Sequence, residues 1–342
     1  MRRQAIVGLL LSLACLVYVL WEVDFPRLWQ LIKDINPLYP LAVNALYALV
    51  FWFRSLRWRW LLAPVKACGL GRLYSATIIG FMGNNVLPAR LGEFVRAYAL
   101  SRLETTPVSS VLGSLVVERL LDGLTILALL FLTLLFVDPR AQAGAFSAEH
   151  LRAAGLGLFL LYLVVLAVVL GLVFRPEATE RLLRGLTHRV WPSLAPKVGR
   201  TAHNFSQGLL ALRRGGHLGR LVGYSLLVWS GMLGMGWVFL PAVGLPSSPL
   251  LAAMALVGGA MAAAVPAGPG FVGTYQLAAT WSLMLVGVDR EKALAFSLIY
   301  WAVQYFPLVV AGLIEMWRRG MNLESLGQKG RELAQEEEGA AS

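Results

Sequence analysis

The sequence is poor in charge, in histidine and in cysteine, and each shortage excludes a class of protein. Charged residues make up 14% of the 342 residues, whereas about 25% is usual for a soluble domain. The two cysteines, Cys15 and Cys68, lie in separate segments, so we expect neither a disulfide framework nor a cysteine-rich metal site. The histidines have no ligand-like spacing, and the sequence has no phosphate-binding loop of the ATPase type. We therefore expect no metal, no cofactor and no ATP-driven step.

Apolar residues are abundant instead. They account for 58% of the chain, and the mean hydropathy is +0.66, which predicts an integral membrane protein. The formal net charge is +11, and the basic residues cluster in loops. This favours orientation in a membrane and contact with anionic lipid, and it argues against a nucleic-acid partner. The length leaves no room for a separate catalytic domain, so we expect a single membrane domain over 1–330 and a disordered acidic tail over 331–342.

The orientation of the chain follows from its most basic stretch. Residues 175–220 carry nine arginine or lysine side chains and two glutamates, so this stretch is predicted to be cytoplasmic. Counting back through spans predicted over 151–174 and 108–137, the segment 74–100 must enter and leave the membrane on the cytoplasmic side. Its arms have about 11–13 residues each, too few to cross about 30 Å of hydrocarbon. We therefore predict a re-entrant hairpin with its tip at residues 84–88.

The second half repeats this order of elements. Spans are predicted over 221–240 and 293–317, and the segment 249–287 between them is interrupted by AVPAGPGFVG. We predict a second re-entrant hairpin from the opposite face, with its tip near 266–270. Two full crossings give the same parity, so both arrangements stay open.

The two predicted breaks resemble each other. Pro88-Ala89-x-x-Gly92 and Pro266-Ala267-x-x-Gly270 have the same spacing. With the matching element order, this predicts two repeats of opposite orientation, over 1–137 and 151–320. The predicted fold class is an all-α integral membrane protein with about six full spans plus two re-entrant helical hairpins, about eight membrane segments in all. The residues expected to break the hairpins are Pro88, Gly92, Pro266, Gly268, Pro269 and Gly270.

Three further segments complete the predicted layout. The apolar run 5–20 follows two arginines and precedes no small-residue cleavage site, so we expect a retained first span. A second span over 38–53 ends where Arg54 and Arg57 alternate with tryptophans, which indicates anchoring in the cytoplasmic headgroup layer or contact with headgroups. Residues 175–216 are predicted to form interfacial helices on the cytoplasmic leaflet or, alternatively, a solvated connector. Both termini are expected on the cytoplasmic side of the cell's inner membrane.

The first hairpin carries the strongest candidate binding residues. Arg90, Glu93 and Arg96 are spaced to share one helix face. The helix begins just after Pro88, so its positive dipole end lies near the tip, and an arginine there can pair two phosphate oxygens. This predicts a site for an anionic headgroup. The alternative is that the arginines only pair with neighbouring carboxylates and lock the hairpin.

Other polar residues extend this predicted site. Glu118 and Asp122 are spaced i, i+4 beside Arg119, and they form either a structural ion network or, with Glu93, a site for proton coupling. The glycines of the second break permit close backbone approach, for packing or for binding. Uncharged side chains that we expect to contact the substrate are Asn84, Asn85, Tyr275, Gln276, Tyr300 and Gln304.

Three motifs resemble a known family. The run N-x-x-L-P-A-R-x-G-E-x-x-R over 84–96 looks like the signature of the lysylphosphatidylglycerol synthase transmembrane region, a flippase-like domain. E-R-x-x-D over 118–122 and P-x-x-P-G-x-x-G-T-[FY] over 266–275 resemble its next motifs, in the same order. The resemblance implies a multi-span protein that moves a lipid between leaflets. Lipids linked with the family are aminoacylated phosphatidylglycerol, polyprenyl-linked sugars and hopanoid-type lipids.

Two departures from the family pattern limit what the resemblance implies. Bifunctional members carry a soluble aminoacyl-transferring domain after the membrane region, whereas this chain ends shortly after its last predicted span. We therefore do not expect it to synthesise lysyl lipid. Many relatives have an acidic residue where Gln276 stands, which weakens the case for a coupling role at this position.

The sequence thus predicts a flippase or lipid-linked substrate translocase, not an enzyme, that binds an anionic headgroup near the membrane midplane. Expected partners are membrane lipids: anionic phospholipid, a polyprenyl-phosphate-linked lipid or a similar molecule. The chain is also compatible with a homo-oligomer. One alternative is a secondary transporter of a small anion, with a site sealed from lipid. Another is an intramembrane enzyme acting on a lipid phosphate, which requires a nucleophile or metal cluster that the sequence does not offer.

Overall fold

The structure is a computed structural model, and the residues that it describes are mostly helical. They are residues 10, 12–18, 25–87, 91–138, 142–143, 146–175, 177–179, 181–182, 184–185, 218–262, 268–322, 326–328 and 332. The helices are α2 (Phe25–Lys33), α3 (Leu38–Leu62), α4 (Leu70–Val86), α5 (Gly92–Glu104), α6 (Val108–Leu134), α7 (Ala148–Phe174), α10 (Leu218–Phe239), η2 (Leu240–Val243), α11 (Pro249–Ala262), η3 (Pro269–Phe271), α12 (Thr274–Met284) and α13 (Arg290–Arg318). Two short strands, β1 (Gln142–Ala143) and β2 (Phe146–Ser147), pair antiparallel between α6 and α7.

The helices fall into two length classes. The five helices α3, α6, α7, α10 and α13 have 22 to 29 residues, enough for about 30 Å of hydrocarbon. The four helices α4, α5, α11 and α12 have 11 to 17 residues and reach at most about 26 Å at 1.5 Å per residue. By length and composition, two stretches within the described residues can cross a membrane, Gly219–Val243 and Arg290–Arg318.

The short helices form two antiparallel hairpins, α4–α5 and α11–α12. In the first, the Gly92 backbone N–H donates to Asn84 Oδ1 at 2.9 Å near the tip. At the base, the Gly69 N–H donates to Glu104 Oε1 at 2.7 Å. In the second hairpin, Gly258 lies against Ser282 of the facing helix. The first hairpin is longer than the sequence analysis predicted, because α4 already begins at Leu70 and α5 continues to Glu104.

In both breaks a residue that precedes a proline is extended. Leu87, just before Pro88, is extended with φ −89° and ψ 145°. Gly268, just before Pro269, is extended with φ −65° and ψ 173°. A proline disfavours helical geometry in the residue that precedes it, because its ring carbon clashes with that residue's backbone. Helix α4 therefore ends at Val86, just before the extended Leu87, whereas α11 already ends at Ala262. Pro88 and Pro266 themselves lie outside the described residues.

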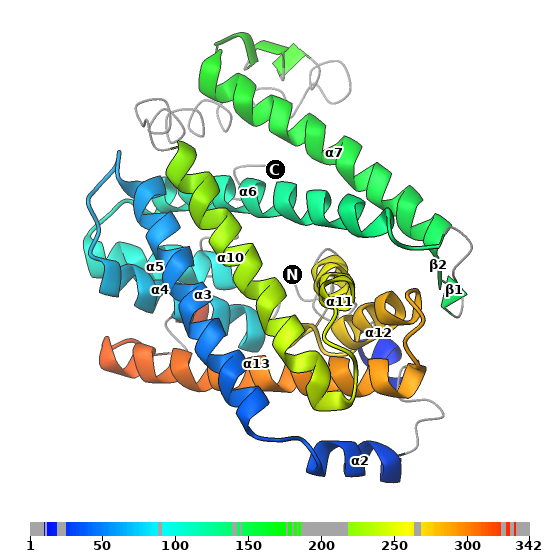
Figure 1. Cartoon of the computed structure of the whole chain (residues 1–342). Helices are drawn as coiled ribbons and strands as arrows, with labels where there is room; N and C mark the ends of the chain where they lie inside the picture. The colour runs from blue at the N-terminus through cyan, green and yellow to red at the C-terminus, as the bar shows by residue number, and fades with distance from the viewer. Residues whose placement is uncertain are drawn as a thin grey trace.

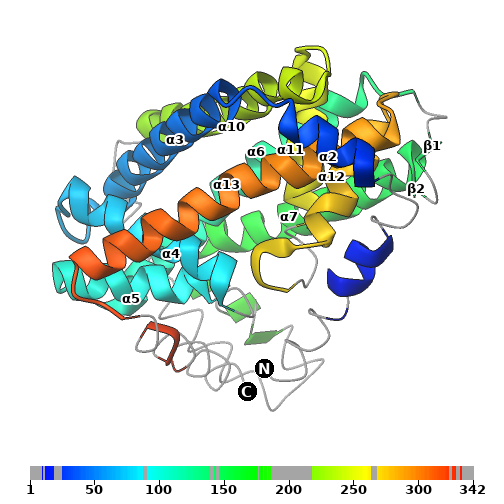
Figure 2. The same cartoon turned by 90° about the horizontal axis from the view of Figure 1, so that it is seen from below.

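Each half of the chain packs a helix of its hairpin against a long helix of the other half. Helices α3 and α10 lie side by side along their length, while α13 runs beneath the first hairpin (Figure 1, Figure 2). Helix α4 of the first half packs on α13 of the second, and α11 of the second half packs on α6 of the first. Three hydrophobic clusters, centred on Phe239, Leu100 and Leu130, fill the spaces between these helices.

Helix α13 touches the break of both hairpins. Its Trp301 Nε1–H donates to the carbonyl oxygen of Gly270 at 2.8 Å. Its Tyr305 hydroxyl donates to the carbonyl oxygen of Asn85 at 3.4 Å. The α4 segment also packs directly against η3. The two breaks, 185 residues apart in sequence (270 − 85), therefore meet on one helix.

The outer surface is strongly apolar. Large apolar side chains such as Leu135, Phe136 and Trp317 are 68–80% exposed, and Figure 1 shows α7 at the upper edge of the bundle, above α6. Exposed apolar surface on this scale is typical of lipid contact. Most of the predicted first span (5–21) and most of the predicted interfacial region (175–216) lie outside the described residues, as does almost all of the tail.

Candidate functional site

Charged side chains from three helices meet in the interior, between the first hairpin and α3. Arg96 comes from α5, Glu118 and Asp122 from α6, and Arg54 and Arg57 from α3. Each of these side chains is no more than 6% exposed. Charges with so little solvent access require partners, and the structure supplies them within the cluster.

Arg96 and Glu118 form the best-aligned pair. Arg96 Nη1 lies 2.8 Å from Glu118 Oε1, and Nη2 lies 3.1 Å from Oε2. Nη2 also donates to Thr77 Oγ1 at 3.2 Å. The guanidinium stacks over the ring of Trp58, with 3.9 Å from Cζ to the ring centroid. This two-pronged geometry ties α5 to α6, the first hairpin to the following long helix.

Asp122 is held by α3 and α10. Arg57 Nη1 lies 2.7 Å from Asp122 Oδ1, and Arg54 Nη1 lies 3.1 Å from Oδ2. Trp229 Nε1–H of α10 donates to Oδ1 at 3.2 Å. Because Glu118 and Asp122 each face at least two guanidinium groups, the contacts favour a structural ion network over proton coupling for these two carboxylates.

Arg119 differs from the other arginines of the cluster. Its side chain is 43% exposed, and it lies 3.3 Å from Glu118, 3.4 Å from Glu93 and 3.6 Å from Asp122. None of these contacts is as short as those of Arg57, Arg54 and Arg96. Arg119 is therefore the guanidinium that can turn toward a ligand at the lowest cost in lost protein contacts.

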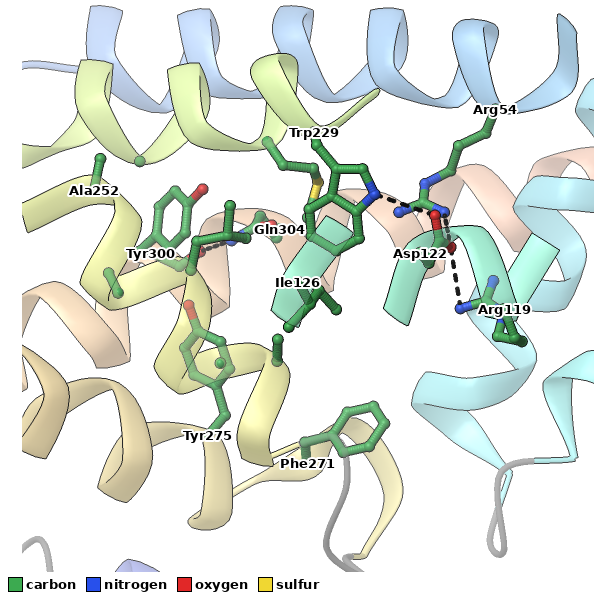
Figure 3. Close-up of a pocket in the computed structure, with 16 residues that line it drawn as sticks. Arg54, Arg119, Asp122, Ile126, Trp229, Ala252, Phe271, Tyr275, Tyr300 and Gln304 are labelled. Atoms are coloured by element: carbon green, nitrogen blue, oxygen red, sulfur yellow. Dashed lines mark hydrogen bonds and ion pairs between the residues drawn. The ribbon is translucent and has the colours of Figure 1, made fainter. Parts of the chain in front are cut away.

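A cavity of about 270 Å³ opens beside Arg119 and extends between the two halves. Figure 3 shows Arg54, Asp122 and Arg119 at one end, Trp229 near the middle, and Tyr275 and Tyr300 toward the other end. Its lining residues are Arg54, Arg119, Asp122, Ile126, Trp229, Met232, Gly236, Ala252, Ala255, Leu256, Gly259, Ala260, Phe271, Tyr275, Tyr300 and Gln304. The cavity thus has a charged end and an aromatic end.

The aromatic end of the cavity has two tyrosine hydroxyl groups that make no hydrogen bond to another described residue, and one residue with an unfavourable backbone conformation. No hydrogen bond joins the Tyr275 or Tyr300 hydroxyl to another of the described residues, whereas Gln304 Nε2 donates to the Tyr300 carbonyl oxygen at 3.1 Å. Phe271 has a positive φ of 57°, which is unfavourable for a bulky side chain. Backbone strain of this kind clusters at ligand sites and switch regions.

Comparison with known proteins decides the family. Residues 5–312 match the family described as the lysylphosphatidylglycerol synthase TM region. The chain belongs to this family. The resemblance drawn from the three sequence motifs is therefore confirmed, and with it the expectation of a membrane protein.

Three curated proteins illustrate what the chain is similar to. Glycosyltransferase AglD of Haloferax volcanii is 27% identical over 98% of this chain and 58% of its own length. The UPF0104 membrane protein MJ1595 of Methanocaldococcus jannaschii is 26% identical over 48% of each chain. MJ1078 of the same organism is 22% identical over 68% of this chain and 91% of its own. The chain spans about half the length of the first two relatives, and no solved structure matches it.

The structure separates the predicted site residues of this family member into three groups. Arg119, Asp122, Tyr275, Tyr300 and Gln304 line the cavity. A second group, called the framework residues, makes contacts with other helices or loops of the protein and does not line the cavity. It comprises Arg96, Glu118, Asn84, Asn85, Gln276 and Glu93. Arg90 lies outside the described residues, so its predicted role in binding stays a prediction.

All of these framework residues except Glu118 were expected to bind substrate. The contacts of Asn84 and Gln276 explain why these two side chains do not line the cavity. Asn84 Oδ1 accepts from the Gly92 N–H across the first break. Gln276 is 1% exposed, and its Oε1 accepts from the Gly273 N–H at 2.6 Å, where it caps α12. Both amides therefore stabilise the ends of hairpin helices, whose first N–H groups lack intrahelical partners.

The sequence analysis missed Arg54 and Arg57 as members of this cluster. It interpreted them as headgroup anchors at the end of a span, but α3 continues to Leu62 and buries both. Their i, i+3 spacing, which places them on one helix face, was the available signal, since Glu118 and Asp122 show a matching i, i+4 pattern. Within the described residues, no group of His, Cys, Asp and Glu side chains is arranged to hold a metal ion.

Proposed function

We propose that this protein moves an anionic, membrane-anchored headgroup between the two leaflets, and that the headgroup binds in the cavity between the halves. The observation that carries the proposal is the cavity itself. Its wall combines helices of both halves, and a half-exposed arginine lies at one end among buried carboxylates. In this arrangement Arg119 binds the headgroup phosphate, while the lipid tail stays in the bilayer.

The packing of the helices supports an inverted-repeat mechanism. Each half inserts its first hairpin arm against the last long helix of the other half, α4 on α13 and α11 on α6. The four hairpin helices are too short to cross about 30 Å of hydrocarbon. These features suit two re-entrant hairpins that enter from opposite faces and meet near the midplane, the arrangement in which alternating access operates around a central site.

The relatives support a lipid-linked substrate. The family is named for the membrane region of lysylphosphatidylglycerol synthase, and AglD is named as a glycosyltransferase. Transport rather than catalysis is the activity that we propose for this chain. Glu93 is the candidate for proton coupling, because its Oε2 is buried without a hydrogen-bond partner and Arg119 lies 3.4 Å from its Oε1.

A leaflet-exchange assay tests the proposal. The purified chain is reconstituted into proteoliposomes with labelled anionic phospholipid or polyprenyl phosphate, and exchange is followed by quenching of the outer leaflet. We expect Arg119→Gln to slow exchange at least about tenfold, equivalent to about 1.4 kcal/mol. Arg119→Lys keeps the charge but loses the two-pronged geometry, so we expect an intermediate rate.

Arg318→Gln is the matched control, because Arg318 is 61% exposed and pairs with Glu315 far from the cavity. Exchange that is unchanged in Arg119→Gln, with folding confirmed by thermal melting, contradicts the proposal. Uptake of a free anion without lipid exchange indicates a small-anion transporter instead.

A proton gradient tests the coupling role of Glu93. Exchange that the gradient drives in the wild type but not in Glu93→Gln supports coupling through Glu93, whereas an equal response in both proteins excludes it.

A further inference from the structure

We infer that the cavity takes a phosphodiester headgroup whose distal part is a neutral polyol, such as glycerol or a sugar, and that it discriminates against headgroups that end in an amine. The inference rests on the proposed function of this site and adds the chemical class of the headgroup. Its evidence is the distribution of charge and of free hydroxyl groups along the cavity wall.

All charge on the described wall lies at one end. Of the lining residues, only Arg54, Arg119 and Asp122 are charged, and Figure 3 shows them together, away from Tyr275 and Tyr300. Asp122 is already engaged by Arg57, Arg54 and Trp229. Among the described lining residues, no carboxylate therefore faces the aromatic end, where the ammonium of an aminoacylated or ethanolamine headgroup would need one.

The net charge at the charged end of the cavity matches a headgroup with a single negative charge. The described cluster contains four guanidinium groups, those of Arg54, Arg57, Arg96 and Arg119, and three carboxylates, those of Glu93, Glu118 and Asp122. The difference, 4 − 3, is one positive charge. A phosphodiester carries one negative charge at neutral pH, whereas a phosphomonoester carries about 1.5 to 2. The cluster therefore suits a phosphodiester.

The aromatic end offers hydrogen bonds without charge. The hydroxyls of Tyr275 and Tyr300 both donate and accept, and neither has a hydrogen-bond partner among the described residues. Tyr300 is only 6% exposed, so its hydroxyl depends on the cavity for a partner. The hydroxyl groups of a polyol satisfy such donors and acceptors in pairs.

A matched pair of lipids tests the inference directly. Phosphatidylglycerol and phosphatidylpropanol have the same charge and the same carbon count, and they differ only in two hydroxyl groups. We expect the full chain in nanodiscs to bind short-chain phosphatidylglycerol at least about tenfold more tightly. Lysylphosphatidylglycerol and phosphatidic acid should both bind more weakly than phosphatidylglycerol. Glucosyl phosphopolyprenol against propyl phosphopolyprenol, two phosphodiesters of equal charge, makes the comparison for a polyprenyl lipid with and without sugar hydroxyl groups.

Tyrosine variants link the preference to the cavity. Tyr275→Phe combined with Tyr300→Phe removes only the two hydroxyls. We therefore expect the preference for phosphatidylglycerol over phosphatidylpropanol to fall below about threefold. Tyr39→Phe is the control, because Tyr39 is a partly buried residue of α3 that does not line the cavity. An unchanged preference in the double variant contradicts the assignment of the hydroxyls.

The binding measurement separates this inference from the proposed function. Equal affinity for phosphatidylglycerol and phosphatidylpropanol, or tighter binding of the lysyl lipid through cation–π contacts with the tyrosines, overturns the inference even if leaflet exchange is observed. Selective binding without any leaflet exchange keeps the headgroup class and refutes the translocase.

Discussion

At the scale of single residues, the arginines of the interior cluster are of two kinds. Arg54, Arg57 and Arg96 form a fixed set that is buried and closely paired, whereas Arg119 is partly exposed and more loosely paired. Arg57 and Arg96 are at most 1% exposed and hold their carboxylates at 2.7–2.8 Å, while Arg119 keeps longer contacts and solvent access. From the sequence, pairing of Arg96 with a neighbouring carboxylate was the alternative to headgroup binding, and the contact with Glu118 takes that form. The sequence did not predict that α3 supplies the partners of Asp122, because a long-range pairing leaves no trace in local periodicity.

Removing one member of the fixed set is expected to destabilise the fold strongly. Arg96→Met keeps the side-chain length but leaves Glu118 short of its two-pronged partner in the interior. We expect a loss of about 3–5 kcal/mol in the free energy of unfolding, the usual cost of an uncompensated buried charge. Denaturant titration in detergent, followed by tryptophan fluorescence, measures this loss.

The exposed pair between Arg318 and Glu315 provides the comparison for this measurement. Arg318→Gln breaks a 2.7 Å contact on the surface and is expected to cost less than about 1 kcal/mol. Similar losses in the two variants would show that the interior network contributes no more than a surface ion pair does.

At the scale of secondary-structure elements, the first hairpin depends on glycines where its arms cross. A Cβ atom at Gly80 would lie 2.4 Å from Arg96 Cβ, and one at Gly92 would lie 2.2 Å from the Gly80 carbonyl oxygen. The prolines of the breaks were visible in the sequence, and Pro88 predicted where α4 stops. The close approach of the two arms could not be predicted from the sequence, because a glycine in an apolar segment does not reveal which helix it faces.

Alanine at these crossings is expected to separate the arms. Gly80→Ala and Gly92→Ala should each cost about 1–3 kcal/mol through overpacking, and each should slow leaflet exchange. Gly71→Ala, in the same helix α4 as Gly80, meets no atom within 4 Å and should be neutral or slightly stabilising. Thermal melting of the three variants in the same detergent makes the comparison. A loss in Gly71→Ala equal to that in Gly80→Ala would contradict the crossing geometry.

At the scale of the whole molecule, the helical architecture and the two hairpins agree with the sequence analysis, and their relation to the bilayer stays a prediction. Basic loops indicated orientation, and the parity of the spans indicated two segments that turn back. The arginines near the end of α3 show the limit of this method. It placed Arg54 and Arg57 at a membrane surface because hydropathy alone cannot distinguish a headgroup from a carboxylate as the partner of an arginine.

Cysteine labelling tests the predicted topology. In a variant without Cys15 and Cys68, single cysteines at Arg72 and Ser109 flank the first hairpin. We expect both to react with an impermeant maleimide from the cytoplasmic side, because a re-entrant segment returns to the face that it entered.

Two further positions complete the topology test. A cysteine at Asp138, beyond the end of α6, should react only from the opposite side. A cysteine at Ser247, before α11, should react from the same side as the one at Asp138. Labelling of the Arg72 and Ser109 positions from different sides would mean that the first hairpin crosses the membrane once, and the inverted repeat would have to be abandoned.

The contacts of α13 have a consequence for how the two halves can act. The helix bonds to the second break through Trp301 and to the first through Tyr305, and Pro307 lies inside it just beyond both contacts. Each break also has contacts of its own, such as Asn84 with Gly92 and Gly268 with Ser12, but α13 is bonded to both, so we expect a displacement of this helix to affect both. If the proposed transport operates, we therefore expect opening toward one face of the bilayer to be coupled to closing toward the other through α13.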